Sequence, residues 1–315
     1  MIRLQYASDL HLEFAENGSY IKHNPLQVAG DVLVLAGDIG YIGDENYSRH
    51  PFWDWASDNY KQVIVVPGNH EFYKMFDLDS LYNGWTLRIR ANVTCHYNAV
   101  IPLSENTEII ATTLWSNIEP KNAFRTEQAI SDFRRIKYGD DTLGWTRFNM
   151  EHDKCLKFLK ESISRSNTGH IVVVTHHVPS FELLAPEFIG SPLNGAFTVE
   201  LDDFIEKSPI DYWIYGHSHR NIDKIIGRTS CITNQLGYVS HMNTRPSIQE
   251  NISSYIRKKR ADPSRTGSLK NGKVVFNYEQ KGLSEIKFHF RVPVGLVRNI
   301  VGDAAFVYPG NAFCR

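Results

Sequence analysis

The chain has 315 residues, of which 42% are apolar, enough for a substantial buried core that needs no metal or disulfide framework. Its formal net charge of −1 excludes a uniformly basic nucleic-acid-binding protein and a uniformly acidic disordered chain. The charge is unevenly distributed, because residues 242–315 hold 13 basic and 5 acidic side chains, whereas residues 1–241 hold 21 and 30.

Short runs rich in β-branched residues recur before residue 241 and have the length of strands. These runs cover residues 3–7, 32–36, 63–66, 109–113, 171–175 and 212–215. Amphipathic stretches predict helices over residues 77–90, 149–164 and 198–207, and Phe52, Trp53 and Trp55 are interpreted as the core-facing side of another helix. Strands that alternate with helices indicate an α/β fold with a buried, mainly parallel sheet.

The character of the sequence changes near residue 241. Residues 243–273 place clustered Lys and Arg among Ser, Pro, Asn and Gly with weak periodicity, which is typical of a loop or a partly disordered basic segment. Residues 274–278 and 286–292 then alternate well enough to predict two late strands. We therefore expect a large domain over residues 1–241 and a basic C-terminal extension over residues 242–315.

The cysteines and the N-terminus indicate a cellular compartment. Cys95, Cys155, Cys231 and Cys314 lie far apart and form no CxxC pair, so neither a zinc ribbon nor a disulfide framework is expected. The N-terminus has no apolar signal region, and no run approaches the roughly 18 apolar residues that a membrane helix needs. We expect a cytoplasmic protein that does not span a membrane.

Polar side chains that can bind metals follow five of the predicted strands, just beyond the point where each strand ends. They are Asp9, His11, Asp38, Asn69, His70, His176, His177, His217 and His219. Because sites in α/β sheets form beyond the carboxyl ends of strands, we expect these side chains to converge. Carboxylates, imidazoles and an amide oxygen together suit Mn, Fe, Zn, Co or Ni better than calcium, and a structural zinc site is disfavoured without a neighbouring Cys.

Several of these residues belong to short motifs: SDLH at 8–11, GD at 37–38, GNHE at 68–71, THH at 175–177 and GHSH at 216–219. In order and approximate spacing, this pattern resembles the calcineurin-like metallophosphoesterases over residues 1–241. TLWS at 113–116 and DFRRIK at 132–137 are also similar to a bacterial-type branch of that family. The resemblance implies a β-sandwich flanked by helices in α/β/β/α layers, followed here by the C-terminal extension.

The resemblance also implies roles for individual residues. Two divalent metal ions are expected, and seven candidate ligands suit a pair of ions better than one tetrahedral ion. The first ion would be bound by Asp9, His11 and His219, the second by Asn69, His176 and His217, and Asp38 would bridge them. The implied catalytic residue is His70, which would stabilise developing charge or protonate the leaving group. The expected reaction is hydrolysis of a phosphate monoester or diester of a small molecule or nucleotide by a metal-bridging hydroxide.

The sequence departs from the family pattern beside His70. Many members have GDxxD as the second motif, with a last Asp that orients the catalytic histidine, but Tyr41 stands at that position here. Asp44 and Glu71 are both candidates for this role.

Three further residues are candidates for substrate binding. His177 could contact the substrate or support a neighbouring ligand. Arg134 and Arg135 could bind a substrate phosphate, because the guanidinium fork matches its oxygens, or could form an ordinary exposed basic patch.

Two alternatives to the small-molecule phosphoesterase remain open. A nuclease could use the same metals, with the basic residues 257–273 holding a nucleic-acid backbone, and its binding would weaken steeply with salt. A non-catalytic scaffold on the same fold is disfavoured, because the chain keeps all seven ligands and His70.

Overall fold

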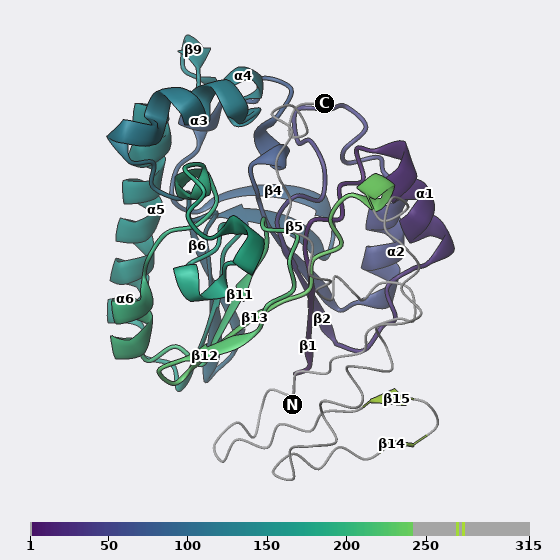
Figure 1. Ribbon diagram of the computed structural model, residues 1–315. Coiled ribbons are helices and arrows are strands. Elements are labelled where there is room, and N and C mark those ends of the chain that lie inside the picture. The colour runs from purple at the N-terminus through teal and green to yellow at the C-terminus, as the bar shows by residue number, and fades with distance from the viewer. Residues whose placement is uncertain (1, 242–268, 271–272, 275–315) are drawn as a thin grey trace.

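Two β-sheets pack face to face, and helices cover the outer side of each, as Figure 1 shows. The structure is a computed structural model, which describes residues 2–241, 269–270 and 273–274. The strands Leu4–Ala7 and Val32–Ala36 are buried along their whole length, which is the pattern expected of strands that lie between two packed layers. The layer order is therefore helix, sheet, sheet, helix, as the sequence predicted.

The first sheet has five strands in the order β1-β2-β3-β5-β4. They are β1 (Leu4–Ala7), β2 (Val32–Ala36), β3 (Gln62–Val66), β5 (Val93–Tyr97) and β4 (Trp85–Arg90), and only β4 is antiparallel to its neighbour. Side chains alternate between the two faces of β2. Val32 and Val34 belong to the core between the sheets, whereas Leu33 and Leu35 pack in the core beneath the helices.

The second sheet has six strands in the order β12-β13-β11-β10-β7-β6. They are β12 (Lys224–Ile226), β13 (Thr229–Thr233), β11 (Tyr212–Tyr215), β10 (His170–Val174), β7 (Thr107–Ala111) and β6 (Ala99–Ser104). The central strands are parallel, and β12 and β6 run antiparallel to their neighbours at the two edges. The parallel strand ends of both sheets point toward the same end of the sandwich.

Helices α1 (Ala15–His23) and α2 (Pro51–Asn59) cover the first sheet, and α5 (Trp145–Arg165) and α6 (Asp202–Lys207) cover the second (Figure 1). Helices α3 (Ala123–Ala129) and α4 (Asp132–Arg135), with the small hairpin β8 (Lys137–Tyr138) and β9 (Asp141–Thr142), lie beside the end of the sandwich. Short elements complete the described chain: η1 (His70–Phe72), η2 (Leu78–Ser80), η3 (Pro120–Asn122), η4 (Phe181–Leu183), η5 (Pro186–Phe188), η6 (Asn194–Ala196), η7 (Val239–His241), β14 (Leu269–Lys270) and β15 (Lys273–Val274).

Most of the predicted elements are confirmed, and one is wrong. All six predicted strands exist within two residues of their predicted bounds, the helix over 149–164 lies within α5, and Phe52 and Trp53 are buried in α2. The helix over 198–207 is shorter than predicted, because only Asp202–Lys207 is helical. The helix over 77–90 is wrong: η2 and then β4 occupy this stretch. In β4, Trp85, Leu87 and Ile89 alternate with polar residues at the period of two that a strand requires.

Some predictions fall where the structure gives no description. The late strands over 274–278 and 286–292 lie outside the described residues except for Val274 in β15, and so does most of the basic segment at 257–273. The nuclease alternative and the domain boundary therefore stay predictions. Within the described part of the chain, no helix combines the length and the apolar character needed to cross a membrane.

Candidate active site

The loops that follow five strands meet at one end of the sandwich. Three of these strands, β1, β2 and β3, belong to the first sheet, and β10 and β11 belong to the second. The backbone N–H of Ser8, just after β1, donates to the carbonyl of Asn234 at 3.0 Å, which ties the end of the first sheet to the segment after β13. His11 and His219 are 208 residues apart, yet their Nε2 atoms lie 3.0 Å from each other. The expected convergence of strand ends is confirmed.

The first cluster contains Asp9, His11 and His219. The Nε2 atom of His219 lies 3.3 Å from Oδ1 of Asp9, and a ligand atom from each of the three residues lies within 4.8 Å of the others. Asp9 and His11 are fully buried, while His219 is partly exposed. The cluster therefore opens to solvent on the side of His219.

The second cluster contains Asp38, Asn69, His176 and His217. The Nε2 atom of His176 lies 3.3 Å from Oδ1 of Asp38, 3.1 Å from Oδ1 of Asn69 and 3.1 Å from Nδ1 of His217. All four side chains are buried. Together the two clusters contain all seven of the candidate metal ligands.

Asp38 belongs to the second cluster and also faces the first. While its Oδ1 faces His176, its Oδ2 lies 3.9 Å from Nε2 of His11 and 4.0 Å from Nε2 of His70. The backbone N–H of His70 also donates to Oδ1 at 2.9 Å, which holds the carboxylate in this orientation. One carboxylate thus presents one oxygen to each cluster.

The hydrogen bonds around the clusters point acceptor atoms inward. The Nδ1–H of His176 donates to the carbonyl of Ala36 at 2.8 Å, so the Nε2 of the neutral ring carries a lone pair. The amide nitrogen of Asn69 donates to Asp132 at 2.8 Å, so the amide oxygen of Asn69 faces His176. Lone pairs that face each other and Asp38 repel unless a cation lies among them. The donor set of carboxylates, imidazoles and an amide oxygen fits a divalent metal ion of intermediate softness.

The pKa values of Asp38 and His176 also indicate that positive charge is stabilised at this site. Burial would raise the pKa of Asp38, but the charges of His176 and His70 outweigh it and hold this pKa well below its usual range. Burial would lower the pKa of His176, but the charge and hydrogen bond of Asp38 raise it to about 9. Without metal, a proton on His176 therefore supplies the positive charge that the second cluster requires.

Backbone conformation also distinguishes these loops. Asp9, His11, Asp38, His217 and His219 all have positive φ, between 48° and 72°. Such left-handed conformations are uncommon for residues other than glycine and gather at functional sites, where the surrounding structure holds them. Gly68 shows how closely the loops pack, because a Cβ atom there would lie 2.3 Å from Oδ1 of Asp38.

Comparison with known proteins identifies the family. The sequence profile of the calcineurin-like phosphoesterases matches residues 3–221, well over half of the chain. The chain belongs to the calcineurin-like phosphoesterase family. It is a metal-dependent phosphoesterase, as the motifs predicted. Uncharacterized protein L509 of Acanthamoeba polyphaga mimivirus is 29% identical over 272 residues, and the match covers 76% of this chain and 92% of the viral protein.

A solved structure shows the same fold. The phosphopantetheinyl hydrolase PptH of Mycobacterium tuberculosis superposes with a TM-score of 0.56 at 16% sequence identity. The superposition covers 78% of this chain and 94% of the mycobacterial one. The phosphoesterase thus shares its layered architecture with a protein to which it has little sequence identity.

Glu71 holds two ligand loops of the phosphoesterase together and is not the partner of His70. Its buried carboxylate accepts hydrogen bonds of 2.7 to 3.2 Å from the backbone N–H groups of Asp38, Ile39, Gly40 and Gly68. Burial and then the charge of Asp38 raise the pKa of Glu71 to about 7, against these hydrogen bonds, which favour the carboxylate. Glu71 is therefore committed to the backbone of the loops after β2 and β3.

Asp44, the other sequence candidate for orienting His70, also lies elsewhere. It accepts a hydrogen bond from the backbone N–H of Asn46 at 2.9 Å and pairs with Lys74 at 3.5 Å. The residue that does reach His70 is Glu13, which was not among the sequence candidates. Its Oε1 lies 2.7 Å from Nδ1 of His70. The only signal in the sequence is that Glu13 shares a motif with Asp9 and His11, SDLHLE at 8–13.

His177 lies behind the second cluster. Its fully buried ring stacks on His217 with centroids 4.3 Å apart, and Phe197 also stacks on His217, at 4.8 Å. Its Nδ1 accepts from the backbone N–H of Ser116 at 3.3 Å and contacts that residue's hydroxyl at 2.8 Å. The side chain thus supports His217 and has no access to solvent, which favours a supporting role over the predicted substrate contact.

The two candidate arginines lie in different surroundings. The exposed Arg134 donates to the backbone carbonyl of Gln128 at 3.0 Å, so it faces the end of α3. The guanidinium of the half-buried Arg135 lies over the ring of Tyr73 at 4.6 Å, and that ring stacks on His70 with centroids 4.4 Å apart. Arg135 is therefore beside the site, whereas Arg134 is turned away from it.

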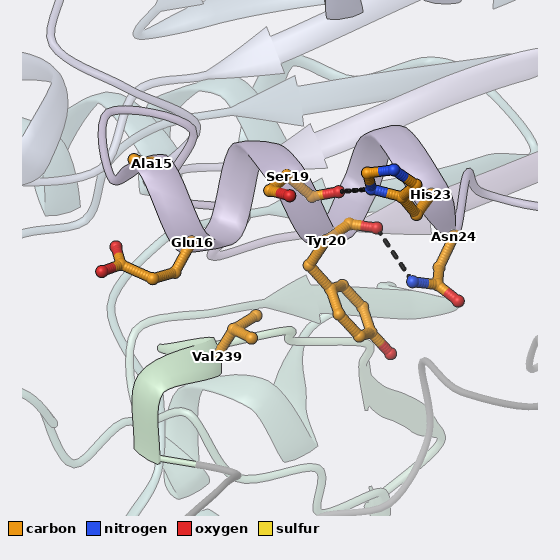
Figure 2. A pocket seen from close by; sticks show the side chains of 7 residues that line it. All are labelled: Ala15, Glu16, Ser19, Tyr20, His23, Asn24 and Val239. Atoms are coloured by element: carbon orange, nitrogen blue, oxygen red, sulfur yellow. Dashed lines mark hydrogen bonds between the residues drawn. The ribbon is translucent and has the colours of Figure 1, made fainter.

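A separate surface pocket lies between α1 and Val239, as Figure 2 shows, and none of the candidate site residues lines it. Two of its polar side chains bond to backbone carbonyls of α1. His23 contacts the carbonyl of Ser19 at 2.8 Å, and Asn24 donates to the carbonyl of Tyr20 at 3.1 Å. These contacts are helix-end interactions, and they give the pocket no part in the phosphoesterase site.

Proposed function

We propose that the two clusters hold two divalent metal ions, drawn from Mn, Fe, Zn, Co and Ni, and that the enzyme hydrolyses a phosphate monoester or diester of a small molecule or nucleotide. The position of Asp38 carries this proposal. Its two oxygens face different clusters, at 3.3 Å from His176 and 3.9 Å from His11, as a carboxylate shared by two ions requires. Asp9 and His219 complete the first set of ligands, and Asn69 and His217 complete the second.

Two bound ions would supply an acidified water for attack and would neutralise charge on the phosphoryl oxygens. The protein contributes a proton donor beside them. Burial opposes protonation of His70, but the charge of Asp38 and the hydrogen bond to Glu13 raise its pKa to about 9 in the metal-free protein. His70 is therefore suited to protonate the departing alkoxide, a contribution typically worth about 10²- to 10⁴-fold in rate.

Arg135 is the cation that we assign to the substrate phosphate. Among the described residues, no carboxylate forms an ion pair with it, and its guanidinium lies over the rings of Tyr73 at 4.6 Å and Tyr41 at 5.4 Å. Both rings lie beside His70, with Tyr41 at 6.0 Å and Tyr73 at 4.4 Å between centroids. A guanidinium stacked in this way is held flat and can offer two parallel N–H donors to a phosphate.

The test of the metal centre combines stoichiometry with turnover. Protein stripped by a chelator is loaded with Mn²⁺ or Zn²⁺, the bound metal is counted by mass spectrometry, and hydrolysis of p-nitrophenyl phosphate and bis(p-nitrophenyl) phosphate is followed. We expect two ions per chain and hydrolysis of at least one ester. Asp38→Asn should bind fewer ions, whereas Asp44→Asn, on the same loop, should bind two. One ion per chain in the wild type, or two ions without turnover of either ester, would contradict the proposal.

The two neighbouring arginines provide a matched test of substrate binding. Arg135→Ala should raise KM about tenfold for whichever nitrophenyl ester the enzyme hydrolyses, because one charge-assisted contact contributes on the order of 1.4 kcal/mol. Arg134→Ala changes the same side chain one residue earlier and should leave KM unchanged. Equal effects of the two substitutions would remove Arg135 from the substrate site.

A further inference from the structure

Glu13 lies where the family pattern leaves His70 without a partner. Its side chain is buried, and one oxygen, Oε1, lies 2.7 Å from Nδ1 of His70 and 3.1 Å from Nδ1 of His11. We infer that Glu13 is the positioning residue for His70, and that through the same oxygen it also orients the metal ligand His11. The inference rests on the proposed function for the role of His70, but not for the hydrogen bonds themselves.

The geometry fixes which nitrogen of His70 faces the reaction. An ionised carboxylate can only accept, so the Nδ1 of His70 must carry a proton and donate it to Glu13. The Nε2 of His70 then points the other way, 4.0 Å from Oδ2 of Asp38 and 3.4 Å from the hydroxyl of Tyr238. A proton on Nε2 is thereby held next to the carboxylate shared by the two clusters, where a leaving group would need it.

The same carboxylate couples His70 to the first cluster. The Nδ1–H of His11 donates to Glu13, which leaves the Nε2 of His11 free to face His219 and the metal position. His11 and His70 also contact each other, with ring centroids 4.5 Å apart. Removing the carboxylate should therefore affect both histidines, but through different observables: turnover through His70, and affinity for the first metal through His11.

Among the described residues, Glu13 is the only carboxylate that hydrogen-bonds to Nδ1 of His70. The oxygens of Glu71 are occupied by backbone N–H groups, and Asp132 accepts from Asn69 and from the hydroxyl of Tyr73. Tyr41, which stands where many relatives have the orienting Asp, brings an aromatic ring toward His70 in place of a carboxylate. The carboxylate that reaches His70 therefore comes from the first motif and not from the second.

The kinetic test compares Glu13→Gln, Glu13→Asp and His70→Ala at saturating metal, with aryl phosphates of good and poor leaving groups. If Glu13 positions a proton donor, Glu13→Gln should lower kcat by about 10²-fold for phenyl phosphate and much less for dinitrophenyl phosphate, whose leaving group needs little protonation. Glu13→Asp, which keeps a charged acceptor, should recover part of the loss. Asp44→Asn should match the wild type with both esters.

A double-mutant cycle shows whether Glu13 acts through His70. In the His70→Ala background, Glu13→Gln should change kcat by no more than about threefold, because the residue that it positions is absent. Full additivity of the two losses, or an equal loss with good and poor leaving groups, would overturn the positioning role and would indicate a general structural effect.

A second readout does not depend on turnover. In the zinc-loaded protein, which is diamagnetic, the Nδ1–H of His70 should give a strongly downfield imidazole resonance that disappears in both Glu13→Ala and His70→Ala. If this resonance survives in Glu13→Ala, the inference is wrong. If it behaves as expected while the wild type binds two ions and hydrolyses no ester, the proposed function fails and the hydrogen bond stands.

Discussion

The two sheets contribute unlike halves to the site. The loops of the first sheet carry the proposed acidic ligands Asp9 and Asp38, together with the glutamates Glu13 and Glu71, whose side chains are buried, whereas the proposed ligands from the second sheet are histidines alone. The two halves are also held by different means. Hydrogen bonds to the glutamates fix the first-sheet loops, while stacking between Phe197 and His177 fixes His217 on the second-sheet side. The first half therefore sets the negative charge, and the second supplies packed imidazole ligands.

The largest expected effect is a loss of stability in the first-sheet half of the site, which is held by hydrogen bonds to glutamates. Glu71→Gln replaces one carboxylate oxygen by an NH₂ group, which would face backbone N–H donors of the loops after β2 and β3. Hydrogen bonds to charged groups contribute about 1.5 to 3 kcal/mol each, so we expect the free energy of unfolding to fall by about 3 kcal/mol. Because these loops carry Asp38 and Asn69, metal content should fall as well. Urea unfolding at pH 8, above the raised pKa of Glu71, measures the first effect.

Glu151→Gln is the matched control for this variant. Glu151 is equally buried, but its donors are the side chains of Tyr97, Tyr138 and Lys154, far from the ligand loops in the chain. It should lose stability and keep two metal ions per chain. If Glu71→Gln also kept both ions with unchanged affinity, glutamate bonding to the backbone would not be what shapes the first half.

A smaller effect, on metal affinity, is expected in the second-sheet half of the site, where stacking fixes His217. Phe197→Leu removes the ring that covers one side of His217, so this ligand should lose part of its fixed orientation. Groups that orient metal ligands commonly contribute about tenfold or more in affinity, and we expect the second metal to bind about tenfold more weakly while the first is unaffected. Competition against a chromophoric chelator measures the two affinities separately.

The control for stacking is a phenylalanine that stacks on no ligand. Phe124 in α3 is 79% exposed, so Phe124→Leu should change neither metal affinity. A Phe197→Leu variant that weakens both metals equally would show that the two halves are not held independently.

The sequence could predict those features that are marked by residues close together in the chain. The strands β1, β2, β3, β10 and β11 are short apolar runs, and the candidate ligands follow within a few residues, so the strands and the convergence of these side chains could both be predicted. The strand β4 was predicted as a helix because Trp85 and Ile89 are four residues apart, a spacing that an amphipathic helix shares with an alternating strand. The turn at Asn83 and Gly84 was the signal that favours a strand there.

Glu13 could not be found in the same way. It meets His70 across 57 residues, and nothing in a single sequence distinguishes a glutamate that turns back onto a histidine from one that faces solvent. The sequence did show that a partner was missing, because Tyr41 replaces the usual aspartate. Arg134 and Arg135 were equally good candidates for phosphate binding for the same reason, since only the fold shows which of two neighbouring side chains faces the site.

The smallest expected effect is the release of protons when metal binds, and it should differ between the two halves of the site. Burial would raise the pKa of Asp9, but the hydrogen bond and charge of His219 lower it, so this first-sheet ligand, like Asp38, is already ionised at neutral pH and releases no proton when metal binds. In the second half, burial and then the charge of His176 lower the pKa of His217 to about 3, so this ring is already neutral. His176, whose pKa is raised to about 9, must lose its proton to bind metal.

Metal binding at pH 7.5 should therefore release about one proton per chain from the second half, or more if the added charge also deprotonates His70. Calorimetric titrations with Zn²⁺ in two buffers of different ionisation enthalpy measure this number, and identical heats in both buffers would contradict it.

The raised pKa of His176 also has a consequence for stability. A histidine whose folded pKa is raised stabilises the metal-free protein fully below about pH 6.5, and this contribution is lost as the pH rises to about 9. The melting temperature of the metal-free protein should fall between pH 7 and 9, whereas the loaded protein, in which the metal replaces the proton, should not show this fall.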